Sequence, residues 1–183
     1  MAEEKYGIQE TKELLSFVFS LAEAIKKLLG PDRVTHLYVY KSFKTVEMMI
    51  DGYSIDLATA RIERYKEPGE NPIVTEAALE KDLARRDFTI NAIAIDLSTN
   101  TLIDPFEGRN SLAKKTIDLI HNSSIKDDPT RVIRAARYAA RFNFDLSNQS
   151  LKQIQRTLKN WPWNWEPGKK TNLAPPALAV RLR

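Results

Sequence analysis

The chain of 183 residues contains no cysteine, which excludes disulfide bonds and thiolate chemistry. It has no run of roughly 18 consecutive apolar residues, the length that a membrane-spanning helix needs. The N-terminal stretch MAEEKYGIQE is acidic and polar, unlike the basic start of a secretory leader. The sequence also has no internal repeat and no low-complexity block. These absences predict a cytoplasmic protein with no membrane partner.

The composition that remains is that of an ordinary globular protein. With 43% hydrophobic and 28% charged residues, wholesale disorder is excluded, and the length suffices for one sizeable core or one domain with an appendage. The net charge of +4 favours polyanionic partners mildly, but so small an excess does not by itself indicate nucleic-acid binding.

The predicted order of elements is a helix, a small sheet and then mostly helices. Apolar residues at helical spacing predict a helix over residues 11–29. Three β-like runs follow: VTHLYVY, KTVEMMI and YSIDLAT. Asp51-Gly52 predicts a tight hairpin between the last two runs. The further predicted elements are a helix over residues 76–85 capped by Thr75, a hairpin turning at residues 98–100, a short strand TIDLI, and helices over residues 129–143 and 147–159. This order predicts an α+β fold with a helical extension.

The segment DDPTRVIRAARYAARF combines four arginines with no acidic residue inside the predicted helix. At about 100° per residue the arginines fall within an arc of about 120°. They are Arg131, Arg134, Arg137 and Arg141. The apolar residues expected to pack on the opposite side are Val132, Ile133, Ala136, Ala139 and Ala140. Arginine's planar fork suits phosphates and base edges. A nucleotide- or RNA-facing surface and a plain solvated face both remain open on this pattern alone.

Asp128 and Arg131 are three residues apart, so their side chains can converge. A carboxylate accepts from an exocyclic amine, and arginine donates to a ring nitrogen. Cytosine and adenine present an amine beside an acceptor nitrogen on their pairing edges, whereas uracil and guanine do not. The pair could therefore select C and A. The alternative is that Asp128 only caps the helix that Pro129 begins.

The stretch DLARRDFTINAIAID places two arginines and an aspartate before an apolar run with one asparagine. Polar groups beside a core-forming segment are costly to desolvate without partners. Either the surface begins here or these residues hold phosphates and hydroxyls.

Together these segments resemble the class II tRNA nucleotidyltransferase and bacterial poly(A) polymerase family over residues 43–144. FKT and IDLATARIERYKEPGENP resemble the family's Phe-Gly-Thr and Asp-x-Ala…Arg-x-Glu-x-Tyr…Pro-Gly segments. RRDFTINAIA resembles its ribose- and phosphate-contacting motif. IDPFEG and DDPTRVIRAARYAARF resemble the hairpin of the head and the nucleotide-selecting helix.

The resemblance implies an α+β fold: a partial polymerase-β-like nucleotidyltransferase head with a small mixed sheet, followed by an all-helical neck. The implied boundaries are residues 1–120 for the head, 121–160 for the neck and 161–183 for a Trp/Pro-rich linker that begins a helical body. The implied activity is transfer of CMP or AMP from CTP or ATP to the 3′ ends of tRNA or other RNA.

The resemblance also implies a set of nucleotide-binding residues: Arg85, Arg86, Asp87, Asn91, Asp128, Arg131, Arg134 and Arg137. An arginine of the first segment would hold triphosphate oxygens, and Asp87 and Asn91 would bind sugar hydroxyls or brace the pocket. Asp128 and Arg131 would form the template for C and A. For Asn91, a structural role with its amide satisfied by backbone remains the alternative.

The chain departs from the family in its metal-binding residues. Relatives hold Mg²⁺ with two aspartates in an Asp-x-Asp strand, and no Asp-x-Asp occurs upstream of Asp56. Asp56 is the candidate ligand that remains, and one carboxylate is a poor magnesium site. Its alternative is a strand-end aspartate bonded to backbone. Lys44 replaces the glycine of Phe-Gly-Thr.

We therefore expect a truncated chain that is inactive when isolated. A second polypeptide supplying the missing metal-binding strand, as in a split enzyme, and a non-catalytic nucleotide- or RNA-binding remnant are the alternatives. The WPWNW segment is expected either to dock on a helical body or to stack on bases.

Overall fold

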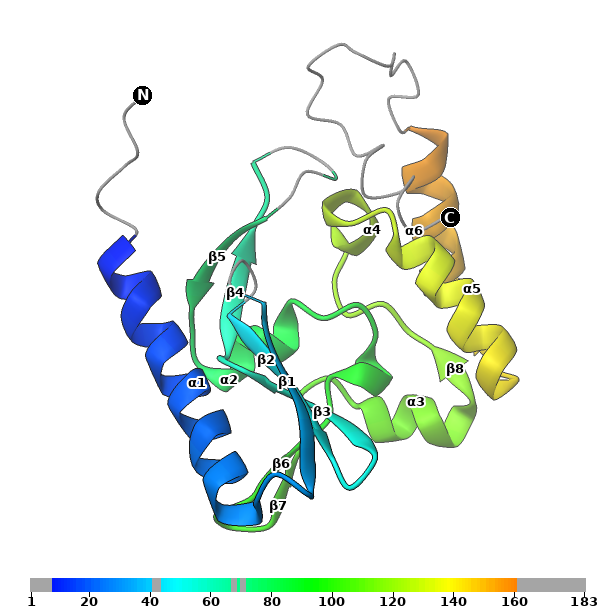
Figure 1. Ribbon diagram of the computed structural model, residues 1–183. Coiled ribbons are helices and arrows are strands. Elements are labelled where there is room, and N and C mark those ends of the chain that lie inside the picture. Colours follow the sequence, from blue (N-terminus) through cyan, green and yellow to red (C-terminus); the bar gives the residue numbers. More distant parts are fainter. Residues whose placement is uncertain (1–7, 41–43, 67–68, 70–71, 161–183) are drawn as a thin grey trace. The chain divides into compact units, whose positions relative to one another are not determined.

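The chain divides into two compact units, Met1–Ala60 and Arg61–Arg183 (Figure 1). The computed structural model describes residues 8–40, 44–66, 69 and 72–160. Its small antiparallel sheets and helices confirm the expected α+β class. Among these residues, no helix is both long and apolar enough to cross a membrane. The predicted boundary between residues 120 and 121 falls inside the second unit and stays a prediction.

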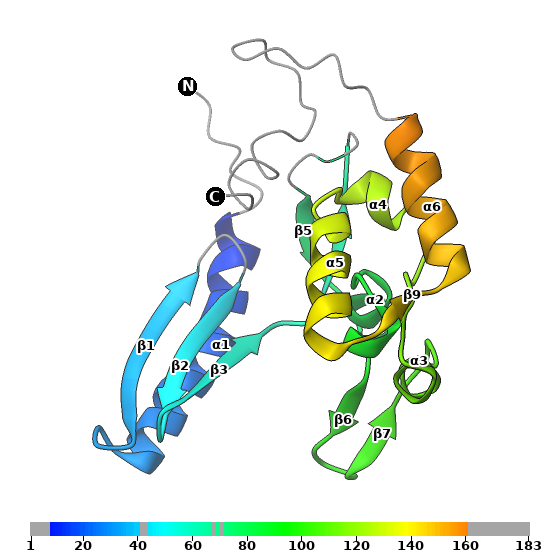
Figure 2. The same ribbon diagram turned by 90° about the vertical axis from the view of Figure 1, so that its right-hand side faces the viewer.

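In the first unit a helix covers one face of a three-stranded antiparallel sheet (Figure 2). The elements are α1 (Ile8–Leu29), β1 (Val34–Tyr40), β2 (Thr45–Ile50) and β3 (Tyr53–Ala58). Because side chains alternate along a strand, Val46 and Met48 of β2 turn to one face and are fully buried. They pack with Val18 and Ala22 of α1, so the helix and the three strands predicted from periodicity are confirmed.

Two turns of this unit need left-handed backbone. Asp51 and Gly52 have φ values of 51° and 82°, and they join Ile50 directly to Tyr53 in the predicted tight hairpin. Lys44 also has a positive φ, of 51°. Glycine adopts a positive φ without steric cost. This backbone conformation therefore explains why the family pattern has glycine at the position of Lys44.

The second unit combines short paired strands with helices. Its elements are β4 (Arg61–Arg64), β5 (Ile73–Glu76), α2 (Leu79–Ala84), the 3₁₀ helix η2 (Thr89–Asn91), β6 (Ala94–Asp96), β7 (Thr101–Ile103), α3 (Gly108–Lys114), β8 (Thr116–Ile117), α4 (Ser124–Asp127), α5 (Arg131–Phe142), β9 (Asp145–Leu146) and α6 (Asn148–Lys159). The hairpins β4–β5 and β6–β7 are antiparallel, and β8 pairs with β9 in parallel. Both predicted C-terminal helices and the predicted hairpin at residues 98–100 are confirmed, whereas the predictions for residues 161–183 lie outside the described residues.

The core of this unit ties the RRDF segment to the helices. Phe88 is fully buried and shares one cluster with Ile117 of β8, Ile125 of α4, Ala135 of α5 and Ile154 of α6. Burying a phenylalanine at such a junction contributes about 1.5–3 kcal/mol. The backbone on either side of Phe88 is thereby held against α4 and α5.

The prediction that Thr75 caps a helix over residues 76–85 is wrong. Thr75 lies in β5, where it pairs with Ile62 of β4, and α2 begins only at Leu79. Cross-strand pairing with a partner distant in sequence outweighed the local capping signal.

The predicted packing face of α5 is confirmed for Val132 and Ala139, which pack against the core, but it is wrong for Ala136 and Ala140. Ala136 and Ala140, expected to be packed, are exposed, whereas Arg131 is 5% exposed and Ala135 is 1% exposed. The buried stripe runs through Arg131 and Ala135 towards Tyr138, at the i, i+4, i+7 spacing of one helix face. Arg131 therefore lies within the packed face and is not presented with the other arginines.

We expect Gly108→Ala to destabilise the second unit. A Cβ at Gly108 would lie 2.3 Å from the carbonyl oxygen of Thr89 and 2.7 Å from Ile93 Cγ1, so backbone must shift. Such overpacking costs about 1–3 kcal/mol. The neighbouring exposed substitution Arg109→Ala should change stability by about 0.5 kcal/mol or less. Urea denaturation of both variants measures the difference, and equal midpoints would contradict the close approach.

Candidate functional site

Asp82 organises the two arginines that follow α2. Its Oδ1 accepts from Arg85 Nη2 at 2.7 Å and from the backbone nitrogen of Arg61 at 3.1 Å, and its Oδ2 accepts from Arg86 Nη2 at 3.0 Å. Burial alone would raise the pKa of Asp82, but the hydrogen bonds and charges of Arg85 and Arg86 lower it below its ordinary value. Sequence reasoning missed this residue, although i, i+3 and i, i+4 spacing in DLARR signals such pairs.

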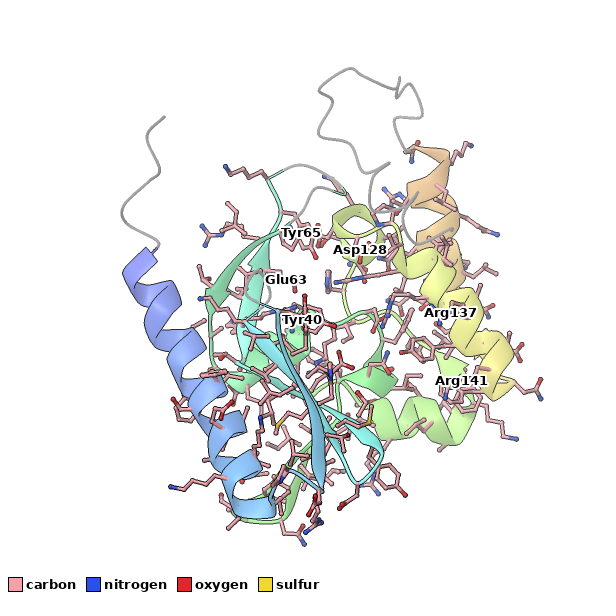
Figure 3. The ribbon with its side chains drawn as sticks, in the orientation of Figure 1. Tyr40, Glu63, Tyr65, Asp128, Arg137 and Arg141 are labelled. Carbon is pink, nitrogen blue, oxygen red and sulfur yellow. The ribbon has the colours of Figure 1, made fainter. Side chains whose placement is uncertain are left out.

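Arg85 faces inward to strand β4. Its Nη1 donates to Glu63 Oε1 at 2.8 Å and its Nε donates to the carbonyl oxygen of Arg61 at 3.1 Å. Glu63 also accepts from the hydroxyl of Tyr65 at 2.9 Å, and both side chains come from the β4 segment (Figure 3). Burial and the Glu63 charge raise the pKa of Tyr65, so this hydroxyl stays protonated and keeps donating. Arg85 thus links α2 to β4 through two carboxylates.

Asp87 joins the RRD segment to α5. Its Oδ1 accepts from Asn91 Nδ2 and from the backbone nitrogen of Phe88, both at 2.9 Å. Its Oδ2 accepts from Arg134 Nε at 2.5 Å, across 47 residues of sequence. Arg86 Nη1 completes the cluster by donating to the carbonyl oxygen of Asn91 at 3.0 Å. The structure therefore brings together Arg86, Asp87, Asn91 and Arg134 from two distant segments, and we name them the Asp87 cluster.

The two guanidinium groups of this cluster are each bonded to a carboxylate but remain partly exposed to solvent. Asp87 is 7% exposed, whereas the side chains of Arg86 and Arg134 are 41% and 37% exposed. Burial opposes the charge of Arg134, but the Asp87 carboxylate outweighs it and raises the pKa of Arg134. Two partly exposed guanidinium groups, each held by a carboxylate, form an arrangement suited to a phosphate oxygen.

Arg131 is held differently, in a socket of three acceptors. Its Nη2 donates to the carbonyl oxygen of Arg85 at 2.7 Å, and its Nη1 donates to Ser124 Oγ at 2.7 Å and contacts His121 Nε2 at 3.4 Å. His121 and Ser124 were not predicted as site residues. Their segment, HNSSIKDD, gave no periodic signal because it enters the site through a single helical turn.

Asp128 shapes the entry into α5 but does not occupy the cap position. Its Oδ1 accepts from the backbone nitrogen of Thr130 at 2.9 Å and from the Thr130 hydroxyl. Thr130, and not Asp128, is the N-cap residue of α5. The carboxylate thus closes a turn two residues ahead, a local bond typical of aspartate.

Arg137 and Arg141 lie further along α5 and are exposed (Figure 3). Arg141 stacks over the ring of Phe142 at 5.7 Å, and Arg134 stacks over Tyr138 at 5.5 Å. With no acidic residue in the helix, α5 carries positive charge along its length.

Asp56, the candidate metal ligand, lies exposed on β3 of the first unit, paired across the strands with Glu47. Both carboxylate oxygens of Glu47 already accept hydrogen bonds, from Tyr40 and from Ser54. Within the described residues no group of three or more His, Cys, Asp or Glu side chains could hold a metal ion. A hard cation such as Mg²⁺ takes near-octahedral oxygen coordination, so Asp56 and Glu47 alone do not fit it.

The sequence pattern of the poly A polymerase head domain matches residues 10–118, more than half of the chain. The chain belongs to this family. The resemblance inferred from RRDFTINAIA and its companion segments is thereby confirmed.

Relatives of this head domain include the A-adding tRNA nucleotidyltransferases of Aquifex aeolicus and Geobacter sulfurreducens. The first is 40% identical over 137 residues, which cover 73% of the chain and 17% of the relative. The second is 43% identical over 112 residues, or 60% of the chain and 13% of the relative. The chain therefore spans less than a fifth of either protein.

Solved structures of CCA-adding enzymes share its fold. The apo form II of a CCA-adding enzyme has a TM-score of 0.68 and 35% identity, covering 78% of the chain and 34% of that structure. A tRNA nucleotidyltransferase complexed with a primer tRNA and an incoming ATP analog has a TM-score of 0.63 and 34% identity, covering 78% and 39%. The nucleotidyltransferase head expected for this chain is confirmed.

We expect Asp82→Asn to weaken the fold around the RRD segment. The variant loses charge-assisted hydrogen bonds to Arg85 and Arg86, at a cost of about 1–3 kcal/mol near pH 7. Because the pKa of Asp82 is lowered in the folded chain, its stabilisation is present above the ordinary value of 3.8 and is lost as pH falls through the folded-state pKa.

Thermal unfolding at pH 7 and at a series of pH values below 3.8 measures this difference, with Glu80→Gln as the matched control. Glu80 lies exposed in the same helix and is also neutralised by an amide. A wild-type advantage over Asp82→Asn that grows on acidification would contradict the assignment.

Proposed function

We propose that this chain is the nucleotide-holding part of a tRNA nucleotidyltransferase, which binds CTP or ATP for transfer of CMP or AMP to RNA 3′ ends. The observation that carries the proposal is the Asp87 cluster. In it a partly exposed arginine of α5 binds a buried carboxylate, and Asn91 connects that carboxylate to a partly exposed arginine of the RRD segment. The likeness to enzymes solved with CTP, with an ATP analog and with a primer tRNA supports the same substrates here.

In this proposal each residue of the Asp87 cluster has a distinct task. Arg86 and Arg134 bind triphosphate oxygens with the edges of their guanidinium groups that face away from Asp82 and Asp87. Asn91 and Asp87 hold one another and present polar atoms to the sugar hydroxyls. Arg85 sets the position of the segment, because its own donors are directed to Glu63 and Asp82.

Nucleotide choice is assigned to Asp128 and Arg131, with Asp128 accepting from the exocyclic amine of C or A and Arg131 donating to the adjacent ring nitrogen. Arg137 and Arg141, exposed on α5, contact phosphates of the nucleotide or of the RNA end. The assignment of Arg137 rests on its exposure and on its place one turn beyond Arg134.

Transfer itself requires carboxylates in addition to Asp56 to hold magnesium, and we derive no catalytic step from the described residues. We propose that these ligands come from a segment outside the 183 residues, either in a longer form of the same protein or in a second polypeptide. For the 183-residue chain alone, nucleotide or RNA binding without transfer is the second candidate function. The hydrogen-bonded state of Glu47 beside Asp56 favours it.

Nucleotide binding is tested with Arg86→Ala and Arg134→Ala. Each removes a charge-assisted contact to phosphate, so affinity for both CTP and ATP should fall about 10- to 100-fold. Isothermal titration calorimetry measures the affinities. Arg156→Ala, an exposed arginine on α6, is the matched control and should bind as the wild type does. Wild-type affinity in both Asp87-cluster variants would refute the proposed site.

Transfer is tested with the isolated chain, tRNA lacking its 3′ end, magnesium and labelled CTP or ATP. We expect no incorporation, because one exposed carboxylate does not hold the metal that the reaction needs. A full-length CCA-adding enzyme serves as the positive control. Robust incorporation by the 183-residue chain would show that its own residues complete the metal site.

A further inference from the structure

The three acceptors around Arg131 come from two segments of the chain. Arg85 lies at the end of α2, Ser124 begins α4, and His121 precedes α4. The Arg131 side chain is almost wholly buried, so these contacts set its orientation. Two of the acceptors, a backbone carbonyl and a serine hydroxyl, keep their accepting character at every ordinary pH. His121 is the acceptor whose chemistry can change.

The hydrogen-bond directions around His121 form a consistent chain. An arginine N–H can only donate, so His121 Nε2 must accept and its ring proton lies on Nδ1. His121 Nδ1 is 3.0 Å from Ser123 Oγ, and Ser123 Oγ in turn donates to Asp127 Oδ2 at 2.8 Å. The Nδ1–H tautomer therefore satisfies every link from Arg131 to Asp127.

The backbone of His121 is fixed independently from α6. Gln153 Nε2 donates to the carbonyl oxygens of His121 and Asn122, each at 2.9 Å. The imidazole thus has a defined place from which to support Arg131. Since Gln153 is neutral, α6 adds no charge to these contacts.

The charges around the ring favour its neutral form. Burial contributes most, and the Arg131 guanidinium on α5 adds to it; together they lower the pKa of His121 below 6.5, against the opposing effect of Asp127 on α4. Protonation would remove the lone pair that accepts from Arg131 and place a second cation beside the guanidinium.

We propose that His121 is a positioning residue that orients Arg131 and thereby controls discrimination between nucleobases. The inference rests on the proposed function, in which Arg131 donates to a ring nitrogen of C or A. Its physical basis is that base readout depends on the angle of a guanidinium fork. Triphosphate binding depends instead on Arg86 and Arg134, which His121 does not contact. Disturbing His121 therefore reduces the extra affinity for CTP and ATP, and it leaves the contribution of the triphosphate group to binding nearly unchanged.

The test compares His121→Leu, which removes the acceptor, with His121→Gln, whose amide oxygen can accept in its place. His36→Leu is the matched control, because His36 is the other histidine of the chain and lies exposed on β1. Affinities for CTP, ATP, UTP and GTP are measured with the full chain at pH 7.5 and at a series of lower pH values. A melting curve for each variant verifies that it is folded.

We expect His121→Leu to lose about tenfold in the preference for CTP and ATP over UTP and GTP, the factor typical of one hydrogen bond to a charged group. His121→Gln should restore much of the preference. The wild-type preference should fall as pH drops through the pKa of His121, which lies below its ordinary value of 6.5, whereas in His121→Gln the preference should not depend on pH. Undiminished preference in a folded His121→Leu would overturn the proposal.

A nucleotide-independent measurement separates this inference from the proposed function. Nitrogen-15 NMR of the histidine rings should show Nδ1 protonated and Nε2 unprotonated in His121 at pH 7.5, with a pKa below 6.5. The opposite tautomer would overturn the His121–Arg131 contact. If the wild type binds no nucleotide, the proposed function and the selectivity role both fail, and the NMR spectrum still decides whether His121 supports Arg131.

Discussion

The second unit depends on one buried carboxylate, that of Asp87. One oxygen is bonded within its own segment, to Asn91 and to the backbone of Phe88, and the other is bonded to Arg134 of α5. Because Phe88 beside it is wholly buried in the core, the carboxylate cannot move away from α5 without disrupting apolar packing. The same residue therefore ties the RRD segment to α5, and through Asn91 it connects the Arg134 guanidinium to that of Arg86.

Arginine serves two purposes in this unit, distinguished by where its donors go. Arg85 and Arg131 use theirs on internal acceptors, whereas Arg86 and Arg134 are anchored on one edge and remain partly exposed. A buried ion pair adds little net stability over apolar packing, yet removing one partner is costly. Such pairs are better explained as positioning devices, since the Arg85 carbonyl that Asp82 helps to fix is itself the acceptor for Arg131.

Local signals predicted much of the fold and named the residues that meet in the Asp87 cluster, but they did not predict the contacts between them. Helical periodicity and the Asp51-Gly52 turn define α1 and the β2–β3 hairpin because both depend on neighbouring residues. The prediction of a helix capped by Thr75 was wrong because Thr75 pairs with a residue of β4 in a hairpin. The helical spacing grouped the four arginines of α5, but their polarity did not reveal that Arg131 is buried. A guanidinium group can be buried when carbonyl and hydroxyl oxygens accept its hydrogen bonds. Those acceptors lie in segments without periodicity.

In the proposed function, the burial of Arg131 has a consequence for how bases are selected. A template arginine on an open surface would sample many rotamers, and each rotamer would present a different donor pattern. In its socket Arg131 has one orientation, set from behind by Arg85, Ser124 and His121, so the entropic cost of ordering it is met during folding and not on binding. Selectivity then depends on how firmly the socket is held, and its one titratable acceptor is an imidazole that α6 fixes by its backbone. Under this proposal, discrimination among bases is a property of the packing between α2, α4, α5 and α6 as much as of the residue proposed to contact the base.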